Sequence, residues 1–181
     1  MPTAGATSPV TGQRKTKVGR VVPGDRDLIV VAASDGYELE AAEQLASVGL
    51  PVRGYLHGGM TAWRSEGRPV KRIEMIDPGE LAERLDGDGG KNGFLVLDVR
   101  DADEFAEGHI PGSVHIPFGD LPQRSGELPR DGTISAVCSG GKRSGLAASL
   151  LQREGFERVL HVADGGVGTW EREGRPIVKG P

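Results

Sequence analysis

The stretch TISAVCSGGKRSGLAASLL, residues 133–151, decides the fold. Its first five residues form a strand-like run, and the alanines and leucines from residue 146 onward recur at helical spacing. Between them lies a short loop with two glycines and a Lys-Arg pair, which begins at Cys138, the only cysteine of the chain. A strand, a tight loop and a helix in this order indicate an α/β fold with a parallel sheet.

Cys138 is predicted to be a nucleophile because of its place between the strand and the helix. Backbone N–H groups of the glycine loop and of the helix N-terminus favour a thiolate over a thiol. The Lys-Arg pair lowers the pKa of the cysteine further. Ser144 is expected either to donate a hydrogen bond to the sulfur or to cap the helix. The residues predicted to bind substrate are Ser139, Gly140, Gly141, Lys142, Arg143 and Ser144.

This loop resembles the active-site motif of the rhodanese family, Cys-x-x-Gly-x-Arg-Ser, and the resemblance covers about residues 73–181. The resemblance implies a rhodanese-like open parallel sheet of five strands flanked by helices, with the reactive loop at the carboxyl ends of the strands. Further signatures are LDVR at 97–100, EF at 104–105, GHIPGS at 108–113, IP at 116–117, Gly165-Gly166 and Trp170.

The length of the loop selects between reactions. Four residues separate Cys138 from Arg143, whereas cysteine phosphatases place five there to hold a phosphate. The tighter loop suits a persulfide, and we expect a sulfurtransferase that moves a sulfane sulfur from thiosulfate or a persulfide to a thiol or cyanide acceptor. The alternatives are a binding or sulfur-relay module, and a CDC25-like phosphatase or arsenate reductase. Because the chain has no second cysteine, the acceptor must be external, either a small thiol or a protein.

Polar residues after the neighbouring strand are expected to support the loop. Asp98 ends an apolar run and is predicted to orient the loop or Arg143, or else to satisfy local backbone groups. Arg100 is also expected to support the loop without touching the substrate, and to pair with Glu104. His109 is interpreted as structural.

Short strands and helices alternate along residues 73–181. Asp77, Pro78 and Glu80 predict a helix with a capping box, and residues 101–104 predict a second one. Trp170 is expected in the core, and the glycines at 165–166 are expected to let the backbone approach the reactive loop. The predicted strands are 94–97, 114–116, 134–137 and 159–162.

An internal repeat is apparent in the chain. WRSEGRPV at 63–70 parallels WEREGRPI at 170–177, and Ala32 stands where the second copy has Cys138. Asp35 and Glu38 replace the loop glycine and serine, so the first copy is predicted to be inactive, and its first half is missing. We expect a loop-like arm at 1–20, a partial, inactive rhodanese-like repeat at 21–72 and a catalytic rhodanese domain at 73–181.

Charge, hydropathy and cysteine content argue against several classes of function. The 181 residues carry a net charge of −4, which argues against a nucleic-acid surface, and no apolar run is long enough to cross a membrane. The lone cysteine and the absence of an apolar leader predict a cytoplasmic protein. No cofactor is expected, and no metal site either, because the four histidines, His57, His109, His115 and His161, lack metal-ligand spacing.

Family context suggests a partner. Tandem copies with one inactive member are common among rhodaneses, and some follow a metallo-β-lactamase domain that oxidises persulfides. This chain lacks a His-x-His-x-Asp-His motif. Such an activity would therefore come from a separate chain or from a preceding part.

Overall fold

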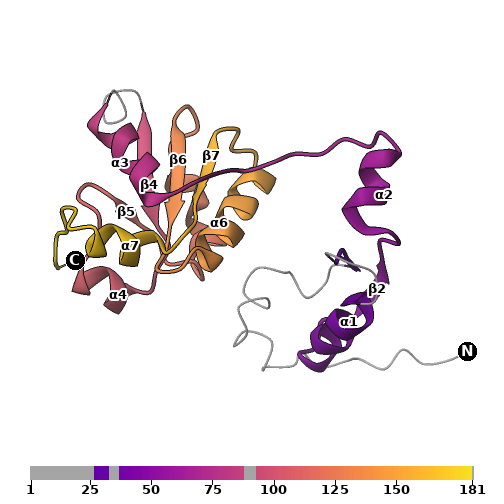
Figure 1. Cartoon of the computed structure of the whole chain (residues 1–181). Coiled ribbons are helices and arrows are strands. Elements are labelled where there is room, and N and C mark those ends of the chain that lie inside the picture. The colour runs from indigo at the N-terminus through magenta and orange to yellow at the C-terminus, as the bar shows by residue number, and fades with distance from the viewer. Residues whose placement is uncertain (1–26, 33–36, 88–92, 181) are drawn as a thin grey trace, which may run out of the picture. The chain divides into compact units, whose positions relative to one another are not determined.

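The computed structural model describes residues 27–32, 37–87 and 93–180. The chain divides into two compact units, with the boundary between Lys71 and Arg72 (Figure 1). The arm expected at 1–20 and the predicted carboxylate at Asp35 lie outside the described residues. Within the described ranges, no helix is long and apolar enough to cross a membrane.

The first unit contains four elements: β1 (Leu28–Val30), α1 (Tyr37–Ser47), β2 (Val52–Tyr55) and α2 (Gly59–Ser65). The strands β1 and β2 pair in parallel and form a two-stranded sheet. At the start of α2, Gly59 has a φ of +55°, and a Cβ built there would lie 3.1 Å from the carbonyl oxygen of Ala32. The backbone after β1 therefore approaches the start of α2 closely.

The segment after α2 folds back on Trp63. The indole Nε1 donates a hydrogen bond to the carbonyl of Pro69 at 2.9 Å. The Arg68 guanidinium lies 5.0 Å from the centre of the indole and pairs with Glu66 at 2.7 Å. These contacts fix the end of the first unit.

The second unit is an α/β domain. Its five strands form one sheet in the order β3-β7-β6-β4-β5, and every pair is parallel. The predicted fold class is thereby confirmed, and so are the four predicted strands, to within one residue at each end. The strand β3 was not among them. The elements are β3 (Glu74–Ile76), α3 (Pro78–Asp86), β4 (Phe94–Asp98), α4 (Ala102–Glu107), β5 (Val114–His115), α5 (Leu121–Arg124), the 3-10 helix η3 (Ser125–Glu127), β6 (Thr133–Val137), α6 (Lys142–Arg153), β7 (Val159–Val162) and α7 (Gly166–Arg172).

The predicted helix starts are present. Asp77 caps α3: its Oδ1 accepts from the backbone of Glu80 at 2.8 Å, and Glu80 Oε2 accepts from the backbone of Asp77 at 2.9 Å. The helix α4 begins after Asp101, whose backbone N–H donates to Glu104 Oε2 at 3.2 Å.

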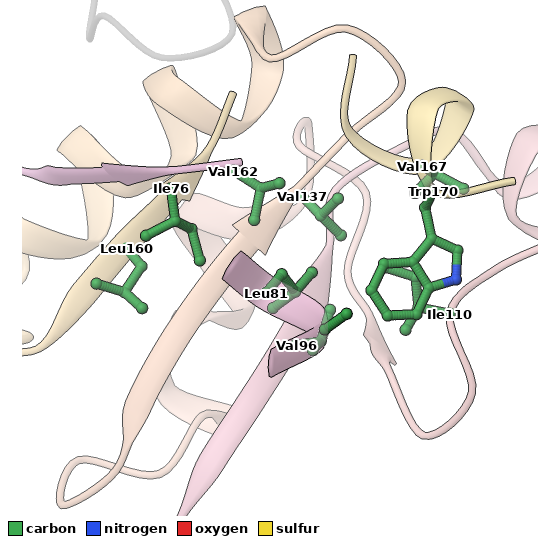
Figure 2. Close-up of a cluster of buried hydrophobic side chains, with 10 residues drawn as sticks. Ile76, Leu81, Val96, Ile110, Val137, Leu160, Val162, Val167 and Trp170 are labelled. Carbon is green, nitrogen blue, oxygen red and sulfur yellow. The ribbon is translucent and has the colours of Figure 1, made fainter. Parts of the chain in front are cut away.

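Helices cover both faces of the sheet. Figure 1 shows α6 on one side, where it packs on β6 and β7, and α3 with α7 on the other. Trp170 is 4% exposed, which confirms its predicted place in the core, whereas Leu146 is 42% exposed and does not belong to the buried face of α6. The apolar cluster beneath α3 and α7 (Figure 2) consists of Ile76, Leu81, Ala82, Val96, Ile110, Val137, Leu160, Val162, Val167 and Trp170.

A buried ion pair closes the end of β4. Asp98 is fully buried, and its carboxylate accepts from Arg100 Nε at 3.0 and 2.9 Å and from Nη2 at 2.7 Å. The same Nη2 also donates to the carbonyl of Gly108 at 2.7 Å. The pair therefore ties β4 to the loop after α4, next to the strand that leads into Cys138.

Replacing Asp98 by Ala is expected to destabilise the protein by about 3–5 kcal/mol, because the Arg100 charge would stay buried without a partner. The matched control is Glu74→Ala, which breaks the exposed Arg84–Glu74 pair and is expected to change stability by about 1 kcal/mol or less. Urea unfolding of both variants checks this. Equal losses would contradict the role of the buried pair.

Candidate active site

Cys138 follows β6 directly and is only 1% exposed to solvent. Its sulfur accepts hydrogen bonds from the backbone N–H groups of Gly141 at 3.1 Å and of Ser144 at 3.4 Å. Gly141 is the N-cap of α6 and has a φ of +84°, a conformation that favours glycine. The loop thus curls around the sulfur and presents N–H groups to it, as expected for a site that stabilises an anion.

These contacts change the acidity of the thiol. Burial acts to raise the pKa of Cys138 and is the largest single influence. It is outweighed by hydrogen bonds from the Ser144 hydroxyl and from the backbone N–H groups of Ser144, Gly140 and Arg143. The pKa of Cys138 therefore lies below its ordinary value, and the thiolate is favoured.

The main chain of Cys138 is held from the opposite side. Its carbonyl oxygen accepts from the N–H of Val167, at the start of α7, at 3.0 Å. Gly166 lies against this peptide with a φ of +46°, and a Cβ there would collide with the Cys138 carbonyl. The expectation that the glycines at 165–166 let the backbone approach the reactive loop is confirmed for Gly166, whereas a Cβ on Gly165 would meet Thr169 instead.

Ser144 lies beneath the sulfur and is fully buried. Its Oγ is 3.4 Å from Cys138 Sγ, 3.0 Å from the Gly141 carbonyl and 3.2 Å from the Val162 carbonyl. The alternative that Ser144 caps α6 is wrong, because the helix begins at Lys142 and its N-cap is Gly141.

Arg143 binds one carboxylate of α4 and one at its N-cap. Its guanidinium donates to Glu104 at 2.5 and 2.7 Å and to Asp101 at 3.1 Å. A further hydrogen bond of 2.9 Å reaches Ser139 Oγ and crosses the loop. The expected pairing of Arg100 with Glu104 is wrong. Glu104 forms an ion pair with Arg143, and Arg100 pairs with Asp98, as described above. The carboxylate of Asp98 correspondingly binds Arg100 and not Arg143.

This ion pair perturbs both partners. The hydrogen bonds from Arg143 lower the pKa of Glu104 to about 2 against an opposing effect of burial. The Glu104 carboxylate in turn raises the pKa of Arg143. Glu104 is therefore ionised at neutral pH, and much of the guanidinium charge is compensated.

The rim of the loop is accessible. Ser139, Gly140 and Lys142 are exposed. In the described part of the chain, the Lys142 ammonium forms no ion pair, so its charge remains available to an anion.

Sequence reasoning missed two contacts of the loop. Glu104 is predicted to cap a helix and to pair with Arg100, whereas in the structure its carboxylate binds Arg143. His161, on β7, was considered only as a metal ligand, but its Nε2 lies 2.8 Å from the Gly141 carbonyl. Strand alternation could have pointed to it, since Leu160 and Val162 face α3 and α7 and His161 must face α6. Among the described residues, no group of three His, Cys, Asp or Glu could hold a metal ion.

The family model of the rhodanese-like domain matches residues 77–173, more than half of the chain. The chain belongs to the rhodanese family. A sulfurtransferase from Allochromatium vinosum is 35% identical over 106 residues, which cover 59% of this chain and 95% of the relative. YrkF of Bacillus subtilis, whose name describes a sulfur carrier, is 31% identical over 139 residues, 77% of this chain and 70% of the relative.

A solved structure is similar as well. The crystal structure of a rhodanese-related protein from Thermoplasma volcanium has a TM-score of 0.51 and 31% sequence identity to this chain. The similarity covers 59% of this chain and 98% of that protein. Known rhodanese-like structures thus share the α/β fold of the second unit.

The Glu104–Arg143 pair makes an acid-dependent contribution to stability. A carboxylate whose pKa falls on folding stabilises the protein above its unfolded pKa, and this contribution is lost as the pH falls through the folded pKa. We expect the stability difference between wild type and Glu104→Gln to be complete above about pH 5.5 and to vanish towards about pH 2. Urea unfolding from pH 7 to pH 2.5 measures it. A difference independent of pH would contradict the ion pair.

Proposed function

We propose that the second unit is a sulfurtransferase with Cys138 as its nucleophile. The observation that carries this proposal is the buried sulfur surrounded by backbone N–H groups from Gly141 and Ser144. Such a cradle stabilises a thiolate before the reaction and a persulfide anion after it. Membership of the rhodanese family and the sulfurtransferase name of the Allochromatium relative support the same chemistry.

The reaction proceeds in two steps. With thiosulfate as donor, the Cys138 thiolate attacks the outer sulfur, forms an S–S bond and releases sulfite as the S–S bond of the donor breaks. A thiolate acceptor, or cyanide, then attacks the outer sulfur of the persulfide and regenerates the Cys138 thiolate. Each step transfers one sulfur atom and conserves charge. A persulfide donor reacts in the same way, with a thiolate as leaving group.

The two cations of the loop have different roles. Arg143 is clamped by Glu104 and Asp101 and bridges to Ser139, so its main effect is to hold the loop in shape. Lys142 is exposed and unpaired in the described part of the chain, so it attracts the anionic donor. Asp98 and Arg100 act further away, by fixing the end of the neighbouring strand.

A sulfur-relay function is the second candidate. The YrkF relative has a sulfur-carrier name, and a relay would use the same Cys138 persulfide without rapid turnover of small donors. A phosphatase or arsenate reductase has less support, because the loop has only four residues between Cys138 and Arg143.

We further propose that the first unit is a partial, inactive rhodanese repeat. Its contacts have counterparts in the second unit: Trp170 donates to the Pro176 carbonyl at 2.8 Å as Trp63 does to Pro69. Arg175 pairs with Glu173 at 2.8 Å, as Arg68 pairs with Glu66. The close approach of α2 to Ala32 likewise parallels that of α7 to Cys138. With an alanine at position 32, this unit has no nucleophile there.

The partners follow from the chemistry. The donor is a small anion and the acceptor a thiol of low molecular weight or of another protein, in a reducing cytoplasm that keeps the single cysteine free. A separate protein of the metallo-β-lactamase type that oxidises persulfides is a further candidate partner, suggested by family context. Nucleic acid and membranes are not proposed as partners.

Incubation with thiosulfate or glutathione persulfide is expected to add one sulfur, about 32 Da, to the intact protein. Reductant should remove this mass, and Cys138→Ser should not acquire it. Intact-protein mass spectrometry measures the gain. Unmodified wild-type protein with every donor would overturn the proposal, and hydrolysis of p-nitrophenyl phosphate by Cys138 would favour the phosphatase instead.

Substitutions in the loop should separate the structural effect of the Arg143–Glu104 ion pair from the effect of positive charge on donor binding. Arg143→Ala is expected to lower kcat/KM for thiosulfate by about one to three orders of magnitude, and Arg143→Lys by nearly as much, because lysine cannot bind Glu104 in the same bidentate way. Lys142→Ala should lower kcat/KM less, about threefold to tenfold, and weaken its dependence on salt. Steady-state kinetics at two ionic strengths checks this. Full activity of Arg143→Lys would show that charge alone matters.

A further inference from the structure

Three hydrogen-bond donors approach one carbonyl oxygen behind the reactive loop, that of Gly141. They are the backbone N–H of Gly145 at 3.0 Å, the Ser144 hydroxyl at 3.0 Å and Nε2 of His161 at 2.8 Å. A carbonyl oxygen has two lone pairs, so one of the three donors is in excess.

Two of these donors have no alternative position. The N–H of Gly145 belongs to the first turn of α6. The ring of His161 packs against the same helix so closely that a Cβ built on Gly145 would lie 3.1 Å from its Cε1. Since a carbonyl can only accept, the proton of the imidazole resides on Nε2. His161 and Gly145 together occupy both lone pairs.

The Ser144 hydroxyl is the donor that can turn elsewhere. Its other acceptors are the Val162 carbonyl at 3.2 Å and the sulfur of Cys138 at 3.4 Å. A hydrogen bond to an ionised acceptor is roughly twice as strong as one between neutral groups. A negatively charged sulfur therefore draws the proton of Ser144, provided that the Gly141 carbonyl does not compete for it.

We propose that His161 is a positioning residue: by occupying the Gly141 carbonyl, it releases the Ser144 hydroxyl to the anionic sulfur of Cys138. For the thiolate this needs only the geometry described here, and its extension to the persulfide rests on the proposed function. The neutral Nε2–H tautomer and the imidazolium both carry this proton, so either form of the ring donates to the carbonyl.

The segment proposed as the inactive repeat lacks this arrangement. The strand pairs Ile29–Gly54 and Ser135–Leu160 correspond, so Tyr55 takes the place of His161. By the same alignment, Leu39, which is 67% exposed, takes the place of Gly145. The imidazole thus occurs together with the cysteine and is missing where the cysteine is Ala32.

The test measures the rate at which iodoacetamide alkylates Cys138 as a function of pH. Because the chain has one cysteine, the mass gain reports on this residue alone. His161→Phe keeps a ring but has no donor, and it is expected to slow alkylation below the pKa of the thiol about two- to tenfold. His161→Gln supplies an amide N–H and should restore most of the rate. Thermal melting confirms that each variant is folded.

A double-mutant cycle separates this role from a general structural one. In a Ser144→Ala background, His161→Phe should have no further effect, because there is no hydroxyl to release. Additive effects of the two substitutions on the alkylation rate would overturn the proposal, and so would equal rate losses in His161→Phe and His161→Gln. An alkylation rate in His161→Phe equal to that of wild type at every pH would also overturn it.

A second variant reaches the same contact from the helix. Gly145→Ala places a Cβ 3.1 Å from Cε1 of the ring and crowds its hydrogen bond to the Gly141 carbonyl, so it should slow alkylation. An unchanged rate in this variant would also count against the proposal. All these rates are independent of sulfur transfer. If wild type gains no sulfur from any donor while the alkylation pattern holds, the proposed function fails and the role of His161 stands.

Discussion

One peptide contact fixes the site: the Val167 N–H donates to the Cys138 carbonyl across Gly166. This contact joins the end of β6 to the start of α7, and only a residue without Cβ permits it. With the main chain of Cys138 held from the α7 side, its sulfur meets the N-terminus of α6 and the N–H groups of Gly141 and Ser144. The acidity of the thiol depends on this arrangement of backbone groups.

The sequence predicted the fold of the second unit because its signals are local. Capping residues at Asp77 and Glu80 and an apolar run at residues 94–97 specify elements without knowledge of tertiary structure. The loop around Cys138 was predictable for the same reason, since a strand, two glycines and a helix fix its geometry. The short edge strand β3 was missed because three residues with two exposed side chains give no clear pattern.

Side-chain pairing was predicted less well. Two arginines and two carboxylates lie near the loop: Arg100, Arg143, Asp98 and Glu104. The sequence alone does not determine which arginine forms an ion pair with which carboxylate. The fold determines the pairing. Asp98 is fully buried and forms an ion pair with Arg100, so Glu104, on the surface of α4, pairs with Arg143. The consequence for the loop is electrostatic, because the charge of Arg143 is neutralised locally, while Lys142 forms no ion pair with any residue that the structure describes. For His161, strand alternation indicates which face of the sheet it lies on, but its hydrogen bond to the Gly141 carbonyl depends on a contact between β7 and α6.

The burial of Cys138 has a consequence for which sulfur atom is attacked in the proposed sulfur transfer. The residue is 1% exposed, whereas its neighbours Ser139 and Gly140 are open to solvent. A transferred sulfur extends about 2 Å beyond Sγ. In thiol exchange, the sulfur that is attacked depends on access. In the proposed reaction, an incoming thiolate is therefore expected to reach the outer atom, so that the acceptor departs as a persulfide and no mixed disulfide forms with the protein. The depth of the sulfur thus determines the regiochemistry, in addition to its acidity.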